Sequence, residues 1–271
     1  MTHSLGTALV TGASSGIGAV YADRLAKRGY DLILVARNSE KLKALAAQLT
    51  SETGRSVKVI PADLGDKTAL AKVEAVLRDD KSITMLVNNA GTAALAPLLS
   101  SDVDQMEAMI TLNVTALTRL AHAVAPAFVA RAAGTIINIG SVVGIAPERL
   151  NGVYGAGKAY VLALTHALQH EIGGKGVRVQ AVLPAATATE IWEKGGFHHS
   201  KLPPGTVMST EDMVDAALVG LDQGEVVTIP PLQDGDEWTR FEAARRELAQ
   251  KFGNSAPAPR YRTAEPARKI A

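Results

Sequence analysis

The sequence contains no cysteine, few aromatic residues and almost no net charge, and each absence narrows the possible functions. Without cysteine the chain cannot form disulfides, thiolate metal sites or a cysteine nucleophile. Aromatic residues make up only 4%, so a core must be built from Ala, Val, Ile and Leu. The formal net charge of +1 gives no general attraction to nucleic acid or to acidic lipid, and we expect neither as a partner.

Long apolar runs are missing as well. The N-terminus, "MTHSLGTALVTGASSG", lacks the basic region and long apolar run that mark a signal peptide. No uncharged apolar stretch reaches the length of a membrane span. We therefore expect a cytoplasmic protein. Hydrophobic residues nevertheless make up 47% of the 271 residues, which is enough for a large core.

Short apolar runs alternate with longer helical patterns along the chain. The expected strands cover residues 7–12, 31–37, 56–64, 83–91, 134–141, 176–185 and 225–231. The expected helices cover residues 16–29, 39–53, 67–79, 103–131, 152–173, 210–224 and 236–253. The strand runs are apolar throughout, as in parallel strands buried on both faces. The pattern predicts an α/β fold: a Rossmann-type, doubly wound parallel sheet of about seven strands with helices on both faces, in three layers.

No linker or internal repeat divides the chain. We therefore expect a single domain over residues 1–253. Residues 254–271 are rich in Pro and Ala and carry four basic residues, which predicts an extended tail. The loop at 187–209 mixes Gly, Pro, His and Trp, and we expect a short helix within it.

The first strand runs into "TGASSGIG", Thr11 to Gly18, which opens the first helix. A helix N-terminus offers free N–H groups and a partial positive charge to an anion. Gly12, Gly16 and Gly18 would let the backbone turn tightly and approach a diphosphate without a Cβ in the way. A plain structural turn is the alternative for the glycines by themselves. The strand–turn–helix context favours a dinucleotide site.

The second strand ends in "LVARN", where a dinucleotide-binding fold approaches the adenosine ribose. An acidic residue there would bind the 2′-hydroxyl and favour NAD. Arg37 stands in that place, and the next acidic residue is Glu40. A guanidinium suits a 2′-phosphate, so we expect NADP(H) in preference to NAD(H). The alternative is a surface arginine that opens a helix.

The stretch "SVVGIAPERLNGVYGAGKA" carries a serine, a tyrosine and a lysine. Tyr154 and Lys158 are four residues apart and share one helix face. A cation beside a phenol favours the phenolate and lowers the pKa of the hydroxyl from about 10. Ser141 ends an apolar strand, and ligands bind at the carboxyl ends of strands in such sheets. The three residues predict proton exchange with a carbonyl or alcohol oxygen beside the nucleotide.

With these motifs in place, the chain resembles the short-chain dehydrogenase/reductase family over about residues 5–230. "TGASSGIG" looks like the glycine motif of the family, and "NNAG" (88–91) is similar to its motif after the fourth strand. Asn113, in "MITLNVTA", matches its helix asparagine. Ser141 and "YGAGK" (154–158) match its serine and its YxxxK motif.

The resemblance implies a catalytic role for each matched position. Tyr154 would exchange a proton with the substrate oxygen, and Lys158 would bind the nicotinamide ribose and tune Tyr154. Ser141 would hold the substrate oxygen, and Asn113 would hold a water in the proton relay. Hydride would pass between nicotinamide C4 and the substrate carbon.

The resemblance also implies the cofactor-binding positions. Asp63 would contact the adenine, with a backbone group from Leu64. The full set is Gly12, Ser14, Ser15, Gly16, Ile17, Gly18, Arg37, Asp63, Leu64, Asn89, Ala90, Gly91, Tyr154, Lys158, Pro184, Thr187 and Thr189. One position departs from the family pattern. Ala185 stands where the family has a glycine after the sixth strand, and we expect a slightly reshaped nicotinamide pocket.

The segment 187–224 would cover the substrate. The side chains expected around the substrate are Val143, Ile145, Leu150, Ile191 and Trp192. They are apolar, with no evident clamp for a phosphate or carboxylate, which favours a small or medium apolar ketone, aldehyde or secondary alcohol. We expect no metal. His166 and His170 are four residues apart, but Glu171 stands in the wrong place for a zinc-protease helix.

The main hypothesis is an NADP(H)-dependent oxidoreductase that acts on a carbonyl or secondary alcohol. A 3-oxoacyl-type reductase is a narrower alternative. An alternative of another class is a regulatory protein that binds NADP without catalysis. A broken set of catalytic residues would favour it, but all four positions are intact. The apolar helices at 103–131 and 152–173, together with the resemblance, predict a homo-oligomer, either a dimer or a homotetramer.

Overall fold

The computed structural model describes residues 5–94, 96–150, 152–194 and 199–261. The chain divides into two compact units, the first ending at Pro231 and the second beginning at Leu232. The first unit contains the sheet and the helices that cover it. The second contains helix α9 (Gly235–Ala249) and a 3-10 turn at Pro259–Tyr261. The predicted domain boundary at residue 253 stays a prediction, and residues 262–271 of the predicted tail lie outside the described residues.

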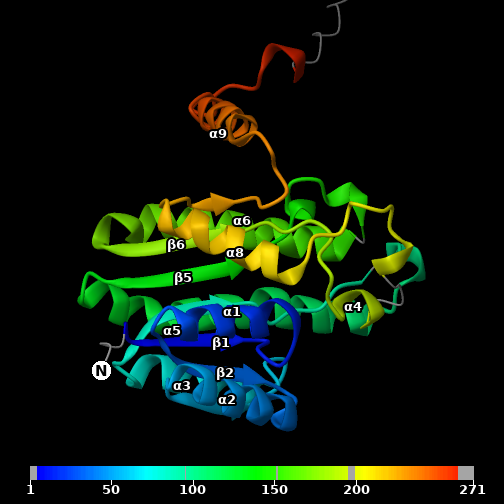
Figure 1. The fold of residues 1–271 in the computed structure, drawn as a ribbon. Helices are drawn as coiled ribbons and strands as arrows, with labels where there is room; N and C mark the ends of the chain where they lie inside the picture. Colours follow the sequence, from blue (N-terminus) through cyan, green and yellow to red (C-terminus); the bar gives the residue numbers. More distant parts are fainter. Residues whose placement is uncertain (1–4, 95, 151, 195–198, 262–271) are drawn as a thin grey trace, which may run out of the picture. The chain divides into compact units, whose positions relative to one another are not determined.

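The sheet has seven parallel strands in the order β3-β2-β1-β4-β5-β6-β7 (Figure 1). The strands are β1 (Thr7–Thr11), β2 (Asp31–Ala36), β3 (Val57–Pro61), β4 (Ile83–Asn88), β5 (Gly134–Ile139), β6 (Val177–Val182) and β7 (Val227–Thr228). The prediction of a doubly wound sheet of about seven strands is confirmed. The strand order reverses between β1 and β4, which is where ligands bind in folds of this kind.

Helices cover both faces of the sheet, so the three-layer prediction is confirmed (Figure 1). One face carries α1 (Gly16–Lys27), α2 (Ser39–Thr53) and α8 (Thr210–Asp222). The other face carries α3 (Lys67–Asp79), α5 (Leu117–Ala130) and α6 (Gly152–Ile172).

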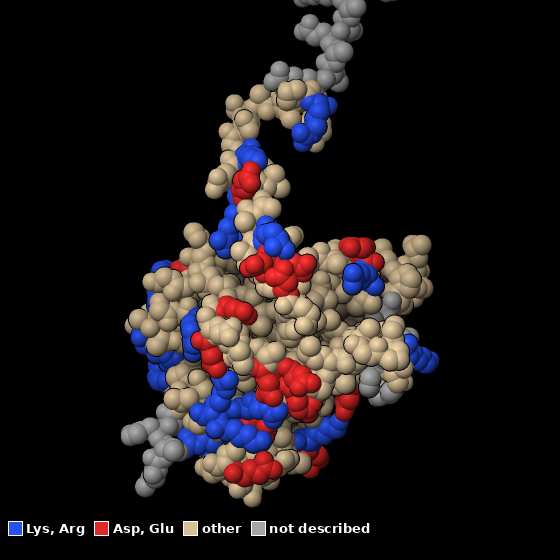
Figure 2. All heavy atoms as spheres, turned by 45° about the horizontal axis from the view of Figure 1, so that its top comes forward, with Lys and Arg blue, Asp and Glu red and all other residues tan. Residues whose placement is uncertain are grey.

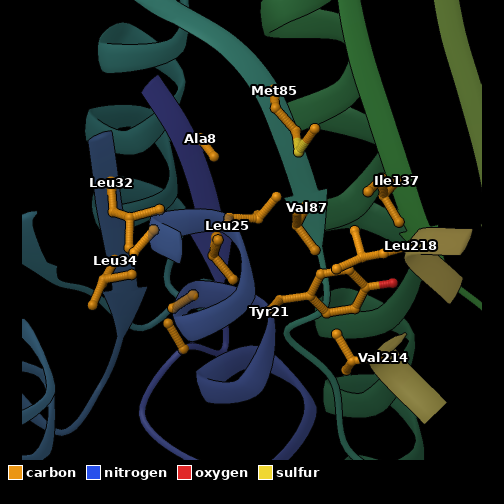
Figure 3. Close-up of a cluster of buried hydrophobic side chains, with 14 of the residues drawn as sticks. Ala8, Tyr21, Leu25, Leu32, Leu34, Met85, Val87, Ile137, Val214 and Leu218 are labelled. Carbon is orange, nitrogen blue, oxygen red and sulfur yellow. The ribbon is translucent and has the colours of Figure 1, made fainter. Parts of the chain in front are cut away.

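The strands are mostly apolar because both faces of the sheet are covered by helices. In β1, Ala8 and Val10 pack into the layer of α1, α2 and α8, whereas Leu9 packs into the opposite layer. Figure 3 shows the first of these layers, in which the ring of Tyr21 from α1 lies among strand and α8 side chains. Tyr21 is fully buried and is one of the few aromatic residues in this aliphatic core.

Local capping fixes the ends of α2 and α3. The Asn38 side chain accepts a hydrogen bond of 2.9 Å from the Lys41 N–H, and the Asp66 side chain accepts one of 2.7 Å from the Ala69 N–H. Each bond satisfies one of the free N–H groups in a first helical turn. Gly54 closes α2 with a φ of +67°, a conformation that favours glycine. Both helices have the bounds predicted from the sequence.

The predicted helix at 103–131 is interrupted. It consists of α4 (Val103–Ile110), a π-helical segment (Thr111–Ala116) and α5. A π-helical turn inserts an extra residue into a helix and frequently lies at a functional site. By length and hydropathy the stretch Val103–Ala130 could cross a membrane, but it packs beside α3 and α6, and core helices meet the same criterion.

Ion pairs join α1 to α8 on the surface of the first unit. Arg24 pairs with Asp215 at 2.7 Å, and Arg28 pairs with Asp222 at 2.9 Å. Figure 2 shows basic and acidic side chains intermixed over the face in view, in keeping with a formal net charge of +1.

Candidate functional site

Two adjoining clefts lie at the carboxyl ends of the strands. The first has a volume of about 390 Å³ and the second about 150 Å³. They share Ile17, Asn89, Gly91, Thr189 and Ile191, so they form one continuous site. This is the edge of the sheet at which the sequence predicts ligand binding.

The first cleft contains most of the residues expected to bind the cofactor. Those that line it are Gly12, Ser14, Ser15, Gly16, Ile17, Arg37, Asp63, Leu64, Asn89, Ala90, Gly91 and Thr189. Other residues that line this cleft were not predicted from the sequence, among them Asn38, Lys41 and Glu190. Lys41 could have been found from its position four residues after Arg37, in the first turn of the predicted helix at 39–53.

The glycine turn requires glycine for two physical reasons. Gly12 has a φ of +66° and Gly16 a φ of +55°, which side chains with a Cβ rarely adopt. Gly18 does not line the cleft but lies beneath it. A Cβ on Gly18 would be 2.5 Å from Nδ2 of Asn89 and closer still to the carbonyl oxygen of Gly12. The third glycine therefore lets α1 begin against the turn.

Thr11 and Asn89 hold the turn against the end of β4. The Thr11 hydroxyl oxygen accepts hydrogen bonds from the N–H groups of Asn89 at 2.9 Å and Ala90 at 3.0 Å. Asn89 Nδ2 donates back to the Thr11 carbonyl at 2.9 Å. The ends of β1 and β4 are thereby fixed across the switch point of the sheet.

The second cleft contains Ser141, Tyr154 and Lys158, all three of them buried. Lys158 Nζ lies 5.7 Å from the centre of the Tyr154 ring and donates a 2.8 Å hydrogen bond to the carbonyl of Ile139, the last residue of β5. The Ser141 hydroxyl donates to the carbonyl of Pro184 at 3.3 Å. The structure therefore brings together the three residues that the sequence analysis selected.

Burial controls the ionisation of this group. Burial raises the pKa of Tyr154 to about 12, while a hydrogen bond with Ser141 acts in the opposite direction. Burial lowers the pKa of Lys158 to about 8. The spacing of Tyr154 and Lys158 predicts that the lysine charge lowers the pKa of the tyrosine, but desolvation dominates because both side chains are buried. At neutral pH the tyrosine is a neutral hydroxyl and the lysine is mostly a cation.

Asn113 lies in the π-helical segment and is buried. Its Oδ1 accepts from the Thr92 N–H at 2.9 Å, and its Nδ2 donates to the Thr92 carbonyl at 2.8 Å. Asn113 therefore holds the loop that follows β4, and it is not among the residues that line either cleft.

The remaining wall of the second cleft comes from the segment after β6. Pro184, Thr187, Ile191 and Trp192 line the cleft, together with Val143 and Leu150 from the segment after β5. Ile145 is 36% exposed and does not line it.

Hydrogen bonds position the segment after β6. Trp192 Nε1 donates to the Thr187 carbonyl at 2.8 Å, and Thr210 Oγ1 donates to the Ala188 carbonyl at 2.8 Å. Ala185 also lines the second cleft, and its φ is not positive, since Ala132 is the one non-glycine residue with a positive φ in the described part of the chain. The backbone at Ala185 therefore does not require the glycine of the family pattern.

Among the described residues, no group of three or more His, Cys, Asp and Glu side chains is arranged to hold a metal ion. The titratable side chains of the second cleft are instead a buried tyrosine and a buried lysine beside a serine. A glycine turn that suits a diphosphate, next to groups that can exchange a proton, is the arrangement of a nucleotide-dependent oxidoreductase.

Comparison with known proteins agrees with this class. A short-chain dehydrogenase from Sphingobium yanoikuyae, solved in complex with NADPH, is 51% identical, with a TM-score of 0.93 over 95% of this chain and 100% of that one. The bulky-bulky ketone specific alcohol dehydrogenase from Comamonas testosteroni is 46% identical, with a TM-score of 0.88 over 96% of this chain and 99% of that one.

A very-long-chain 3-oxoacyl-CoA reductase from Anas platyrhynchos is 36% identical over 189 residues, which are 68% of this chain and 60% of that protein. Residues 6–196 match the family described as short chain dehydrogenase. The chain belongs to the short-chain dehydrogenase/reductase family, and it is an oxidoreductase of the class that interconverts CH–OH and C=O groups.

Proposed function

We propose that the protein is an NADP(H)-dependent oxidoreductase that reduces largely apolar ketones or aldehydes, or oxidises the corresponding secondary alcohols. The residues of the first cleft fit a dinucleotide, because the positions that a Cβ would fill or strain, Gly12, Gly16 and Gly18, are glycines. Arg37 lines the same cleft at the end of β2 and supports NADP(H), since a guanidinium suits a 2′-phosphate.

The cofactor, when bound, supplies or accepts the hydride. We assign the proton to Tyr154. Its hydroxyl stays protonated at neutral pH and can donate to a carbonyl oxygen that is being reduced. Ser141, within hydrogen-bond reach of Tyr154, would hold the same oxygen and orient it. Lys158, fixed on the Ile139 carbonyl, would stabilise the negative charge left on Tyr154.

The observation that carries the substrate class is the lining of the second cleft. Lys158 is the one charged side chain among the described residues that line it, and we assign Lys158 to the proton chemistry. Apolar surface around the catalytic side chains comes from Val143, Leu150, Ile191 and Trp192. An apolar substrate gains from burial there, whereas a phosphate or carboxylate would lose its hydration without a partner.

The test is a turnover panel with NADPH that compares aryl and alkyl ketones of increasing size with phosphorylated and carboxylated ketones of matched length. We expect turnover of the neutral ketones and a loss of at least about 100-fold in kcat/KM for the anionic ones. Turnover confined to the anionic substrates would contradict the proposal. The match to a 3-oxoacyl-CoA reductase supports a second candidate, for which 3-oxoacyl thioesters belong in the same panel.

The cofactor preference has its own test, a parallel titration of wild type and Arg37→Asp with NADPH and NADH. We expect wild type to bind NADPH more tightly and the substitution to reverse the order, since it replaces a phosphate ligand by a carboxylate that suits the 2′-hydroxyl. Equal affinity of wild type for the two cofactors would contradict the assignment of Arg37.

We also propose a homo-oligomer. Ile110 on α4 and Tyr160 on α6 are 44% and 39% exposed and line one apolar groove with Leu98 and Val114. An exposed apolar surface of this kind supports contact between copies. Light scattering of the purified protein distinguishes a dimer or tetramer from a monomer, and a monomer at all concentrations would contradict the proposal.

A further inference from the structure

Two basic side chains, Arg37 just after β2 and Lys41 in the first turn of α2, pair with carboxylates at the first cleft. Arg37 Nη1 lies 4.0 Å from Asp63 Oδ2, and Lys41 Nζ lies 2.9 Å from Glu190 Oε1. All four side chains line the cleft. The second pair joins the first turn of α2 to the segment that follows β6, 149 positions away in the sequence, so it bridges the mouth of the cofactor site.

Glu190 also contacts the glycine turn. Its Oε2 accepts a hydrogen bond of 3.3 Å from the Ser15 hydroxyl. Ser15 immediately precedes α1, whose first turn contains no acidic residue. The carboxylate of Glu190 therefore lies between a helix N-terminus and an ammonium group. These donors are the kind that bind phosphate oxygens in nucleotide sites.

We propose that Lys41 is a second ligand of the cofactor 2′-phosphate beside Arg37, and that Glu190 is an internal counter-ion that this phosphate displaces from Lys41. The inference rests on the proposed use of NADP(H). In this proposal Lys41 favours the binding of NADPH and Glu190 opposes it. Neither residue belongs to the glycine turn or to the catalytic group.

The exposure of the pair makes such an exchange feasible. The Lys41 and Glu190 side chains are 50% and 44% exposed, so solvent screens their attraction and the pair is weak. A phosphate dianion carries more charge than a carboxylate and presents three acceptor oxygens. NADH lacks this phosphate and would leave the pair in place. Glu190 should thus reduce the affinity for NADPH without changing that for NADH.

The competing explanation is a latch. If the contact between Lys41 and Glu190 persisted when the cofactor is bound, it would hold the segment after β6 closed over the cofactor. Glu190 would then increase the affinity for both cofactors alike, since the latch would not depend on the 2′-phosphate. The two explanations give opposite signs for the same substitution.

The experiment measures Kd for NADPH and NADH by fluorescence titration of the full chain, for wild type and four variants. Glu190→Gln removes the counter-ion and keeps the shape of the side chain. Lys41→Gln removes the ammonium, and the double variant tests whether the two act on each other. Glu40→Gln is the matched control, because Glu40 lies on the same helix, is 83% exposed and pairs with Lys43 at 3.0 Å.

We expect Glu190→Gln to bind NADPH on the order of five-fold more tightly, with NADH affinity changed by less than about two-fold. Lys41→Gln should weaken the binding of NADPH by a similar factor. In the Lys41→Gln background, the gain in NADPH affinity from Glu190→Gln should be at least halved. The effects should shrink at high salt. Glu40→Gln should leave both Kd values unchanged.

Three results would overturn the inference. If Glu190→Gln weakened the binding of NADPH and of NADH equally, the contact would be a latch. Unchanged Kd values would mean that the contact between Lys41 and Glu190 has no part in cofactor binding. An equal gain in Glu40→Gln would mean that only the net charge matters. The wild-type titration decides the cofactor preference separately: wild type that does not prefer NADPH contradicts the proposed function, whereas wild type that prefers it while Glu190→Gln has no selective effect contradicts the inference alone.

Discussion

Asn113 and Thr92 form a reciprocal pair, in which the amide of Asn113 receives the Thr92 N–H at 2.9 Å and donates to the Thr92 carbonyl at 2.8 Å. The pair joins the π-helical segment to the loop after β4. Oδ1 has a second lone pair and Nδ2 a second hydrogen, so the side chain can bind a water in addition to the Thr92 main chain. The side chain itself acts on the shape of the loop beside Gly91.

Replacement of Asn113 by alanine should therefore destabilise the protein and reduce turnover. The substitution leaves the N–H and carbonyl of Thr92 without their partner, and we expect a loss of about 1–3 kcal/mol in the free energy of unfolding. Denaturant unfolding measures this loss. Unchanged stability together with unchanged kcat would show that the pair fixes neither the fold nor the loop.

Tyr154→Phe should remove the proton donor and leave the cofactor site intact. We expect kcat to fall by about 10²- to 10⁴-fold, the usual contribution of a positioned acid. The Kd for NADPH should change by less than about two-fold, because the ring and its packing are retained. Steady-state kinetics and a binding titration on the same preparation separate the two effects. A variant that retains most of its kcat would assign the proton to another group.

The pKa values predict the direction of the pH dependence. Reduction requires Tyr154 protonated and Lys158 charged. The pKa of Tyr154 is raised to about 12 and that of Lys158 is lowered to about 8. Below pH 8 both conditions hold, and above it the lysine loses its proton first. The kcat/KM for NADPH, which reports ionisations of the free protein, should therefore fall as the pH rises through about 8.

A charge-retaining variant provides the control for the pH profile. An arginine stays protonated throughout this range, so in Lys158→Arg the fall near pH 8 should disappear if the variant folds and turns over. Persistence of the same fall in that variant would assign the ionisation to a different residue. A circular dichroism spectrum that matches wild type establishes that the larger side chain has been accommodated.

Gly18→Ala tests the close contact between α1 and the glycine turn. The new methyl group would lie 2.5 Å from Asn89 Nδ2, so the helix or the turn must move. We expect a loss of about 1–3 kcal/mol in stability and weaker binding of NADPH and NADH alike. Gly174→Ala is the matched control, since no atom lies within 4 Å of its Cβ position. Similar losses in both variants would point to a general cost of replacing glycine.

Local signals account for the parts of the fold that the sequence predicted best. The bounds of α2 and α3 depend on Asn38 and Asp66, which cap the helix that follows each of them. The predicted strand at 176–185 was too long, because β6 ends at Val182. The apolar run continues through Pro184 and Ala185, which line the second cleft, and hydrophobicity does not separate a sheet residue from a cleft residue.

Long-range features of the site could not be predicted in the same way. "TLNVTA" contains no local signal for a π-helical segment, and its apolar pattern predicts an ordinary α-helix. Ile145 is as apolar as Val143, but it follows the 3-10 turn and stays partly exposed. The pairing of Lys41 with Glu190 depends on the assembled sheet. Their separation of 149 positions gives the sequence no pattern that would connect them.

The reversal of strand order between β1 and β4 has a thermodynamic consequence. The two clefts collect residues from Gly12 to Trp192, so no short fragment of the chain contains the whole site. A ligand that binds only the native state raises the free energy of unfolding, by about 2.7 kcal/mol at a concentration of 100 Kd. The nucleotide concentration thereby becomes one of the variables that set the folded fraction of the protein and its resistance to heat.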